Sequence, residues 1–156
     1  MKFICNKDTI LSVVQTTSKA AAGKSSIQAL EGILMELEGN TLTVTGYDLD
    51  IGIKTSIEVE GIESGNIVIS AKMAVDIIRK MPSGSITFEC SGNNLAEITN
   101  NMTSFSVSCS SADDYPNVPQ VNPDTSFTMP QKLLKSMIIQ TKFAVAVVDS
   151  RPALMG

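Results

Sequence analysis

The sequence has 156 residues, of which 43% are apolar, and it carries a formal net charge of −4 with no histidine. A chain of this length can bury a sizeable core, and its apolar content is normal for a globular protein. The lack of histidine excludes histidine-based catalytic triads and histidine-ligated metal sites. The negative charge by itself argues against binding to nucleic acid.

The first 84 residues alternate between two periodicities. Positions 10, 13, 14, 17 and 21 form a helical stripe expected to face the core, and the β-type runs after it are broken by Gly39-Asn40, which predicts a hairpin turn. Pro82 and Gly84 end a second helix. The expected elements, in chain order, are a strand over 1–6, a helix over 7–21, strands over 32–39, 41–47, 50–61 and 66–70, and a helix over 71–84.

The rest of the chain contains a meander, a linker and a second strand and helix. Three strands are expected over 85–92, 94–100 and 103–110, with Asn/Gly turns at 92–94 and 100–101. Residues 111–124 hold three of the six prolines and little that could join a core, so we interpret them as an extended linker. A strand is expected from residue 126, followed by a helix over 131–142.

The segment after the linker repeats the start of the chain. With an offset of 124 residues, "SFTMPQKLLKSMIIQT" aligns with the N-terminal strand and helix. The aligned pairs include Phe3/Phe127, Ile10/Leu134, Ser12/Ser136, Val13/Met137, Val14/Ile138 and Thr17/Thr141. The period is one whole domain. We therefore predict a tandem-domain protein in which domain one spans 1–121, and 122–156 holds only the first strand and helix of a truncated domain two.

The sequence shows no clear signal for membrane insertion, secretion or redox chemistry. No apolar run reaches the roughly 18 residues of a membrane span, and the N-terminus does not fit a signal peptide. Cys5, Cys90 and Cys109 lie far apart in the sequence and form no C-x-x-C pair. We interpret them as reduced hydrophobic residues of a cytosolic protein rather than as metal ligands or redox groups.

Two candidate chemical sites are present, and both have simpler explanations. Gly23-Lys24-Ser25 resembles the end of a phosphate-binding loop, but Ser18 stands where its first glycine belongs, and the stretch follows a helix. Asp48 and Asp50 would share a strand face and could hold a divalent cation or act as acid and base. We favour structural roles for both carboxylates and predict no catalytic residue, metal or cofactor.

The basic residues are concentrated in three helical windows, 7–24, 72–82 and 131–142. These windows hold nine of the twelve basic residues and two of the sixteen acidic ones, a net charge of +7, whereas the rest of the chain carries −11. The nine are Lys7, Lys19, Lys24, Lys72, Arg79, Lys80, Lys132, Lys135 and Lys142. An acidic protein with one basic face can hold DNA there through its phosphates, without reading its sequence.

The second helix illustrates this pattern. A helical wheel places Lys72, Asp76, Arg79 and Lys80 within one arc. The opposite arc is expected to face the core and contains Met73, Ile77, Ile78 and Met81. Lys19 likewise lies opposite the apolar stripe of the first helix.

Several segments together resemble the β sliding clamp family, the processivity subunits of bacterial DNA polymerase III. They are "MKF", "TGYDLDIGI", "AKMAVDIIRKMP", "SSADDYPNVP" and "FTMPQKLLKSMIIQTKFAVAVVDSR", in the family's order and spacing over the whole chain. The resemblance implies an α+β DNA-clamp fold, with two inward-facing helices packed on antiparallel outer sheets. It also implies a non-catalytic, cytoplasmic, nucleoid-associated subunit that forms a head-to-tail homodimer around duplex DNA.

The resemblance also assigns roles to individual residues. Lys24 matches a basic loop position that contacts DNA, and Lys72 and Arg79 match basic positions on a pore helix. Lys80 and Lys19 join this set through the charge pattern. Arg151 and Leu154 match the rim of the cleft where DNA polymerase III, the clamp loader and other clients dock, although Pro152-Ala153 replace the aromatic residues frequent in relatives.

Two alternatives remain open at this point. The first is a metal-dependent enzyme that uses Asp48 and Asp50. The second is a structural module that does not bind DNA and whose basic helices merely face solvent.

Overall fold

A computed structural model of the chain describes residues 1–92, 94–119, 126–146 and 154–155. The chain divides into two compact units, Met1–Pro119 and Gln120–Gly156. Within the described residues, no helix is both long enough and apolar enough to cross a membrane. The domain boundary at residue 121 stays a prediction.

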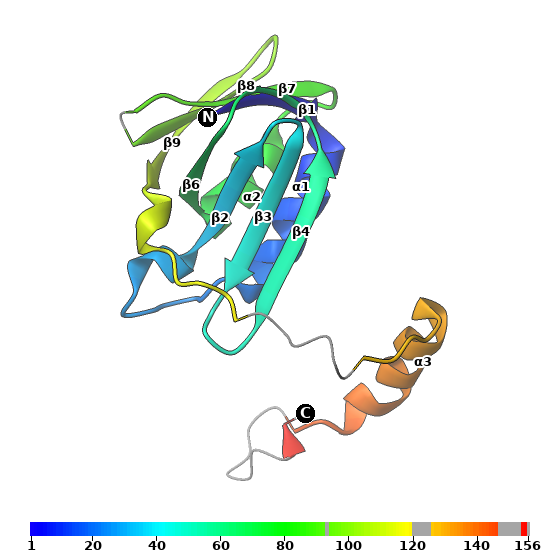
Figure 1. The fold of residues 1–156 in the computed structure, drawn as a ribbon. Helices are drawn as coiled ribbons and strands as arrows, with labels where there is room; N and C mark the ends of the chain where they lie inside the picture. Colours follow the sequence, from blue (N-terminus) through cyan, green and yellow to red (C-terminus); the bar gives the residue numbers. More distant parts are fainter. Residues whose placement is uncertain (93, 120–125, 147–153, 156) are drawn as a thin grey trace. The chain divides into compact units, whose positions relative to one another are not determined.

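The first unit combines two helices with one antiparallel sheet of nine strands (Figure 1). The strand order is β4-β3-β2-β6-β9-β8-β7-β1-β5. The strands are β1 (Lys2–Asn6), β2 (Gly32–Glu38), β3 (Thr41–Tyr47), β4 (Gly52–Glu58), β5 (Glu60–Glu63), β6 (Gly65–Ser70), β7 (Ser85–Cys90), β8 (Leu95–Thr99) and β9 (Ser104–Ser110). The predicted α+β class and the strands expected up to residue 110 are thus confirmed, the run at 50–61 being divided into β4 and β5.

The sheet curls because its two edge strands are consecutive in the chain. Only Val59 separates β4 from β5, so the two edges come together at this residue. Val59 is buried, and its N–H donates to the carbonyl oxygen of Asn40 at 2.8 Å. β9 pairs with β6 through only two residue pairs, and the strand direction changes between the two halves joined there (Figure 1).

Two helices cover one face of this sheet (Figure 1). Helix α1 (Lys7–Thr17) begins at Asn6, whose side chain accepts a hydrogen bond from the N–H of Asp8 at 2.9 Å, and a 3₁₀ turn continues it over Ser18–Ala20. Helix α2 (Ala71–Lys80) begins after Ser70. At Gly46 on β3, a Cβ atom would overlap the carbonyl oxygen of Thr17, so glycine allows the end of α1 to approach the sheet.

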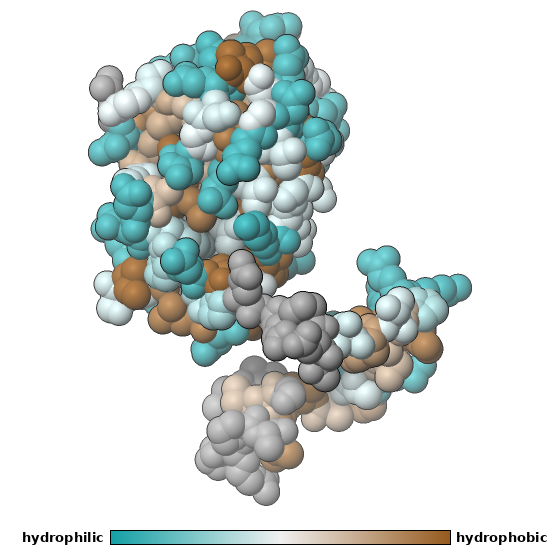
Figure 2. Space-filling model, viewed as in Figure 1, coloured by the Kyte–Doolittle hydropathy of each residue, from teal (hydrophilic) through white to brown (hydrophobic). Residues whose placement is uncertain are grey.

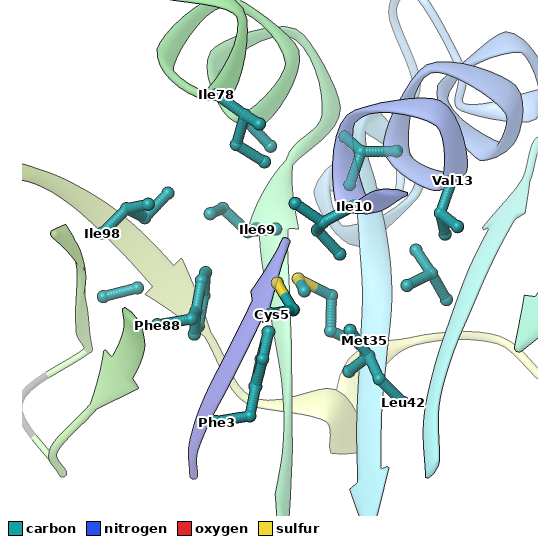
Figure 3. Close-up of a cluster of buried hydrophobic side chains, with 14 of the residues drawn as sticks. Phe3, Cys5, Ile10, Val13, Met35, Leu42, Ile69, Ile78, Phe88 and Ile98 are labelled. Carbon is teal, nitrogen blue, oxygen red and sulfur yellow. The ribbon is translucent and has the colours of Figure 1, made fainter. Parts of the chain in front are cut away.

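The core lies between the helices and the sheet. Figure 3 shows Ile10 and Val13 of α1 and Ile78 of α2 facing strand residues such as Ile69. The rings of Phe3 and Phe88 stack with their centroids 5.1 Å apart. Helix α1 buries Ile10, Val13, Val14 and Thr17, which confirms the first four positions of the predicted stripe.

The interpretation of residues 111–124 as a linker with little to add to a core is wrong for the part that the structure describes. Tyr115 is buried and forms a second apolar cluster with Leu30, Tyr47 and Val68. Its hydroxyl donates to the carbonyl oxygen of Thr45 at 3.3 Å, and burial raises the pKa of Tyr115 to about 12. Val118 packs against the same cluster, so two apolar side chains of this segment contact the first unit.

The second unit contains helix α3 (Gln131–Thr141), followed by a 3₁₀ turn over Lys142–Ala144. The strand predicted from residue 126 is wrong for residues 126–130, which form no regular structure. A strand needs a neighbour for its N–H and C=O groups. No strand occurs among the described residues of this unit that could pair with residues 126–130.

Candidate nucleic-acid interface

Helix α2 presents three basic residues to solvent. Lys72, Arg79 and Lys80 are exposed, whereas the same helix buries Ala71, Ala74 and Ile78. The basic arc predicted from the helical wheel is therefore confirmed.

The composition predicted for the buried arc of α2 is partly wrong. Ile78 and Met81 are buried as expected, but Met73 is 48% exposed and Ile77 is only half-buried. Two alanines form much of the contact with the core, because their small side chains let the helix lie close to its neighbours. The buried arc is thereby rotated away from Met73, which lies on the exposed side with the basic residues.

Lys19 and Lys24 are exposed on the segment that follows α1. Lys19 belongs to the 3₁₀ turn that continues α1, and this turn packs near α2. The loop that carries Lys24 is closed at its base by the N–H of Ala22, which donates to the carbonyl oxygen of Leu30 at 2.8 Å. Leu30 is fully buried in the cluster around Tyr115, so an apolar anchor holds a charged loop. The sequence pattern did not reveal this anchor.

Ion pairing leaves most of these charges available. Arg79 lies 4.0 Å from Asp76, and both side chains are at least half exposed, which makes this a weak pair. Among the described residues, no carboxylate lies within 4.0 Å of the amines of Lys19, Lys24, Lys72 and Lys80. Four unpaired ammonium groups and one weakly paired guanidinium group can therefore contact phosphates.

Part of this charge also has a structural explanation. Arg79 and Lys80 occupy the last turn of α2, where the helix dipole favours positive charge. Lys72 has no such explanation, because it lies in the first turn of the same helix. Lys7 is unsuited to binding, since its side chain is largely buried and its amine lies 3.6 Å from the carboxylate of Asp8.

The outer face of the sheet has a different character. Hydrophilic side chains cover much of the face of β2, β3 and β4 in Figure 2. The exposed carboxylates of the strands include Glu38, Glu58, Glu60, Glu63 and Glu97. The Lys2 amine lies 2.7 Å from the Glu89 carboxylate, and this hydrogen bond lowers the pKa of Glu89. Basic residues thus predominate on the helices and acidic residues on the strands.

The remaining basic residues of the three helical windows and the two predicted cleft-rim residues lie in the second unit. Lys132, Lys135 and Lys142 are exposed on α3 and the turn after it. Leu154 is 44% exposed, and its carbonyl oxygen accepts a hydrogen bond from the N–H of Ala146 at 2.8 Å. Arg151 lies outside the described residues, so the client-cleft rim stays a prediction.

The Asp48/Asp50 hypothesis loses its geometric basis. The two residues lie in the turn between β3 and β4 rather than on a strand face. The Asp48 carboxylate accepts hydrogen bonds from the N–H groups of Ile51 at 2.7 Å and Asp50 at 3.0 Å, and these bonds lower its pKa. The described residues contain no cluster of three or more Cys, Asp or Glu side chains that could hold a metal ion.

The phosphate-loop interpretation of Gly23-Lys24-Ser25 finds no support either. The stretch follows a 3₁₀ turn instead of a strand, and the N–H of Ser25 donates to the carboxylate of Glu31 at 3.2 Å. A carboxylate therefore occupies an amide that a phosphate loop would offer to its ligand.

Comparison with known protein families gives a clear match. Residues 1–119 match the family described as "DNA polymerase III beta subunit, N-terminal domain". Two curated relatives are the beta sliding clamps of Halalkalibacterium halodurans and Bacillus subtilis. Each is 33% identical over an alignment of 164 positions, gaps included. The alignment covers all of this chain and 43% of the relative. The chain thus spans less than half the length of these proteins.

Solved structures agree with this match. A putative DNA polymerase III beta subunit from Eubacterium rectale superimposes with a TM-score of 0.90 and 31% identity, over 99% of this chain and 42% of the other. The DNA polymerase sliding clamp from Bacillus subtilis gives a TM-score of 0.86 and 32% identity, over 97% of this chain and 42% of the other. The predicted clamp fold is therefore confirmed.

Proposed function

Because the chain belongs to the DNA polymerase III beta-subunit family, we propose that it contributes the N-terminal part of a sliding clamp. Such a clamp encircles duplex DNA and keeps a replicative polymerase on its template. The function is topological and requires no chemistry by the clamp itself. We accordingly propose a non-catalytic role.

The observation that carries the proposal is the separation of charge within the first unit. Lys19, Lys24, Lys72, Arg79 and Lys80 are exposed on the helices and the adjoining loop, whereas carboxylates predominate on the strands. A ring with the helices on its inside would hold DNA phosphates by electrostatic attraction and would repel DNA from its outer face. Residues 7–24 and 71–80, which carry these five side chains, contain no aromatic residue. Base stacking is therefore not part of this interaction.

The partners follow from this role. We propose that a clamp containing this chain forms a head-to-tail homodimer, binds duplex DNA of any sequence, and docks DNA polymerase III and the clamp loader through a peptide cleft. Arg151 and Leu154 belong to the rim of that cleft in this proposal. The setting would be the cytoplasm, at the nucleoid.

A chimeric clamp tests the topological role directly. Residues 1–119 replace the corresponding domain of the Bacillus subtilis clamp, and the loaded chimera is followed on circular and linear duplexes. We expect long retention on the circle and rapid loss from the linear DNA, because only free ends let a ring slide off. Equal lifetimes on the two duplexes, with the chimera shown to be dimeric, would contradict the proposal.

The same chimera separates the role of the helices from that of the fold. Lys24→Glu with Arg79→Glu should weaken loading equally on different sequences, because phosphate contacts carry no base information. Lys54→Glu is the matched control, since Lys54 is an exposed residue of β4. Loss of loading in the control alone would place the DNA-binding charge on the sheet.

A further inference from the structure

Two of the three free cysteines contact each other, although the sequence spacing gave no sign of it. The Sγ atoms of Cys90, at the end of β7, and Cys109, near the end of β9, are 3.2 Å apart. Strand β8 lies between these strands in the sheet. Its residue opposite Cys90 is Ala96, which is buried in the core against which both cysteines pack. The small methyl group of Ala96 leaves room for two sulfur atoms on the side that faces the core.

Backbone hydrogen bonds hold both cysteines in place. Cys90 and Met1 exchange two bonds: the Cys90 N–H donates to the Met1 carbonyl oxygen at 2.9 Å, and the Met1 ammonium donates to the Cys90 carbonyl oxygen at 3.1 Å. The N–H of Cys109 donates to the carbonyl oxygen of Asn94 at 2.9 Å. The fold thus brings the two thiols together before any reagent arrives. Because β8 separates β7 from β9, and a disulfide needs its Cα atoms about 4.4–6.8 Å apart, forming the bond also requires the ends of these two strands to move toward each other.

The pair is open to small reagents. Cys90 and Cys109 are half-buried and line a cavity of about 330 Å³ together with Met1, Asn66 and Ser110. The third cysteine differs in both respects. Cys5 is buried in the main core, where burial raises its pKa to about 12, and it does not line this cavity.

We propose that Cys90 and Cys109 are a redox-active dithiol, which small disulfides of the glutathione class convert into an intramolecular disulfide bond. The sulfur atoms must approach from 3.2 Å to the bonded distance of about 2.05 Å. The reaction is thiol–disulfide exchange in two steps, and it needs no metal or enzyme.

The first step belongs to Cys90. Its thiolate attacks one sulfur of the small disulfide, expels a small thiolate and forms a mixed disulfide. Cys109 is the poorer first nucleophile, because burial and the hydrogen bond with Cys90 raise its pKa to about 12. That hydrogen bond is lost once Cys90 carries the mixed disulfide, which makes Cys109 easier to deprotonate.

Cys109 completes the exchange. Its sulfur attacks the Cys90 sulfur, the second small thiolate leaves, and the proton of Cys109 goes to that thiolate. Two protein thiols are oxidised and one small disulfide is reduced to two small thiols. Ring closure is expected to accelerate as the pH rises, because it requires the Cys109 thiolate.

The bond would cross-link a junction of the sheet. Cys109 faces Ile69, and Ser110 faces Val68, in the two residue pairs that join β9 to β6. A bridge from Cys109 to the end of β7 would tie three strands together where the two halves of the sheet meet. The oxidised protein should therefore resist unfolding more than the reduced protein.

The test is oxidation of the complete 156-residue chain by oxidised glutathione, followed by alkylation under denaturing conditions, intact mass and peptide mapping. We expect an intact mass lower by two hydrogen atoms before alkylation, one alkylated thiol instead of three afterwards, and a Cys90–Cys109 cross-linked peptide. We also expect a rise in Tm that dithiothreitol reverses. Cys5→Ala should keep this behaviour, whereas Cys109→Ser should stop at the mixed disulfide.

The wild-type chain alone can overturn the proposal, so the outcome does not depend on whether a variant folds. Three alkylatable thiols after oxidation, a stable mixed disulfide without the cross-linked peptide, or cross-links between separate chains would each contradict it.

Discussion

Helices α1 and α3 have the same length and a matching sequence pattern, but among the described residues only α1 buries side chains against a sheet. Each has 11 residues. The hydroxyls of Thr17 and Thr141 make the same hydrogen bonds, donating at 3.0 and 3.3 Å to the carbonyl oxygens four and three residues earlier. The repeat in the sequence therefore extends to individual hydrogen bonds.

The surroundings of the two helices differ completely. α1 is capped by Asn6 and buries four residues, whereas α3 follows Pro130 without a side-chain cap and buries none. Leu133, Leu134, Met137 and Ile138 are 43–51% exposed. A large apolar side chain gains about 1.5–3 kcal/mol when it is fully buried. An amphipathic stripe therefore specifies which face of a helix can be buried, while the sheet beside it decides whether that burial occurs.

The largest expected difference between these helices is in truncation of aligned residues. Ile10→Ala should lower the free energy of unfolding by about 2–5 kcal/mol, because it leaves a cavity in the core of the first unit. Leu134→Ala, at the aligned position of α3, should change it by less than about 0.5 kcal/mol. Denaturation in urea, followed by circular dichroism, measures both. Similar losses in the two variants would show that α3 is packed as α1 is.

The second difference lies in the helix starts. Asn6→Ala removes the acceptor for the N–H groups of Asp8 and Thr9 and should lower the free energy of unfolding by about 1 kcal/mol. Ser70→Ala at the start of α2 is the control and should cost less, since its hydrogen bond to the Met73 N–H is 3.5 Å long. Pro130→Asp should increase the helicity of α3, which has no cap to lose. An unchanged free energy of unfolding in Asn6→Ala would show that the cap does not contribute to the stability of α1.

The smallest expected effect concerns the carboxylate of Asp48, in the turn between β3 and β4 of the first unit. The described part of the second unit has no hairpin turn between strands. The backbone N–H groups of Ile51 and Asp50 lower the pKa of Asp48 below its ordinary value of 3.8. This carboxylate therefore stabilises the fold above about that pH, and its contribution is lost as the pH falls through the lowered pKa. Asp48→Asn should flatten acid unfolding slightly in that range. An unchanged acid transition would mean that the turn does not depend on the charge of Asp48.

Much of the first unit was predictable because its strands and helices follow simple periodicities. β2 and β3 were predicted to within a residue, since Gly39 and Asn40 mark the turn between them. The packing was less accessible to sequence reasoning. Tyr115 stands among prolines and aspartates and has no periodic context, yet its ring reaches a cluster that also contains Leu30.

The candidate site was predictable in charge but not in detail. The sequence placed Lys72, Arg79 and Lys80 on one exposed arc, but it could not show that α2 packs through alanines and leaves Met73 exposed. It also gave no sign that Cys90 and Cys109 meet, because their contact depends on the order of three strands. Contacts between distant segments follow from topology, which local patterns do not encode.

In the proposed clamp, the helices of the first unit form the surface that faces DNA phosphates. The most direct measurement is the salt dependence of duplex binding by the 156-residue chain, compared with Lys72→Glu/Arg79→Glu and with Lys54→Glu on β4. We expect weak binding without sequence preference, and a log–log salt slope whose magnitude falls by about 0.9 for each phosphate that a variant no longer neutralises. The helix variant should bind with a flatter slope, while Lys54→Glu should bind nearly as the unaltered chain does. A flatter slope for Lys54→Glu alone, or base-specific binding that resists salt, would contradict the claim.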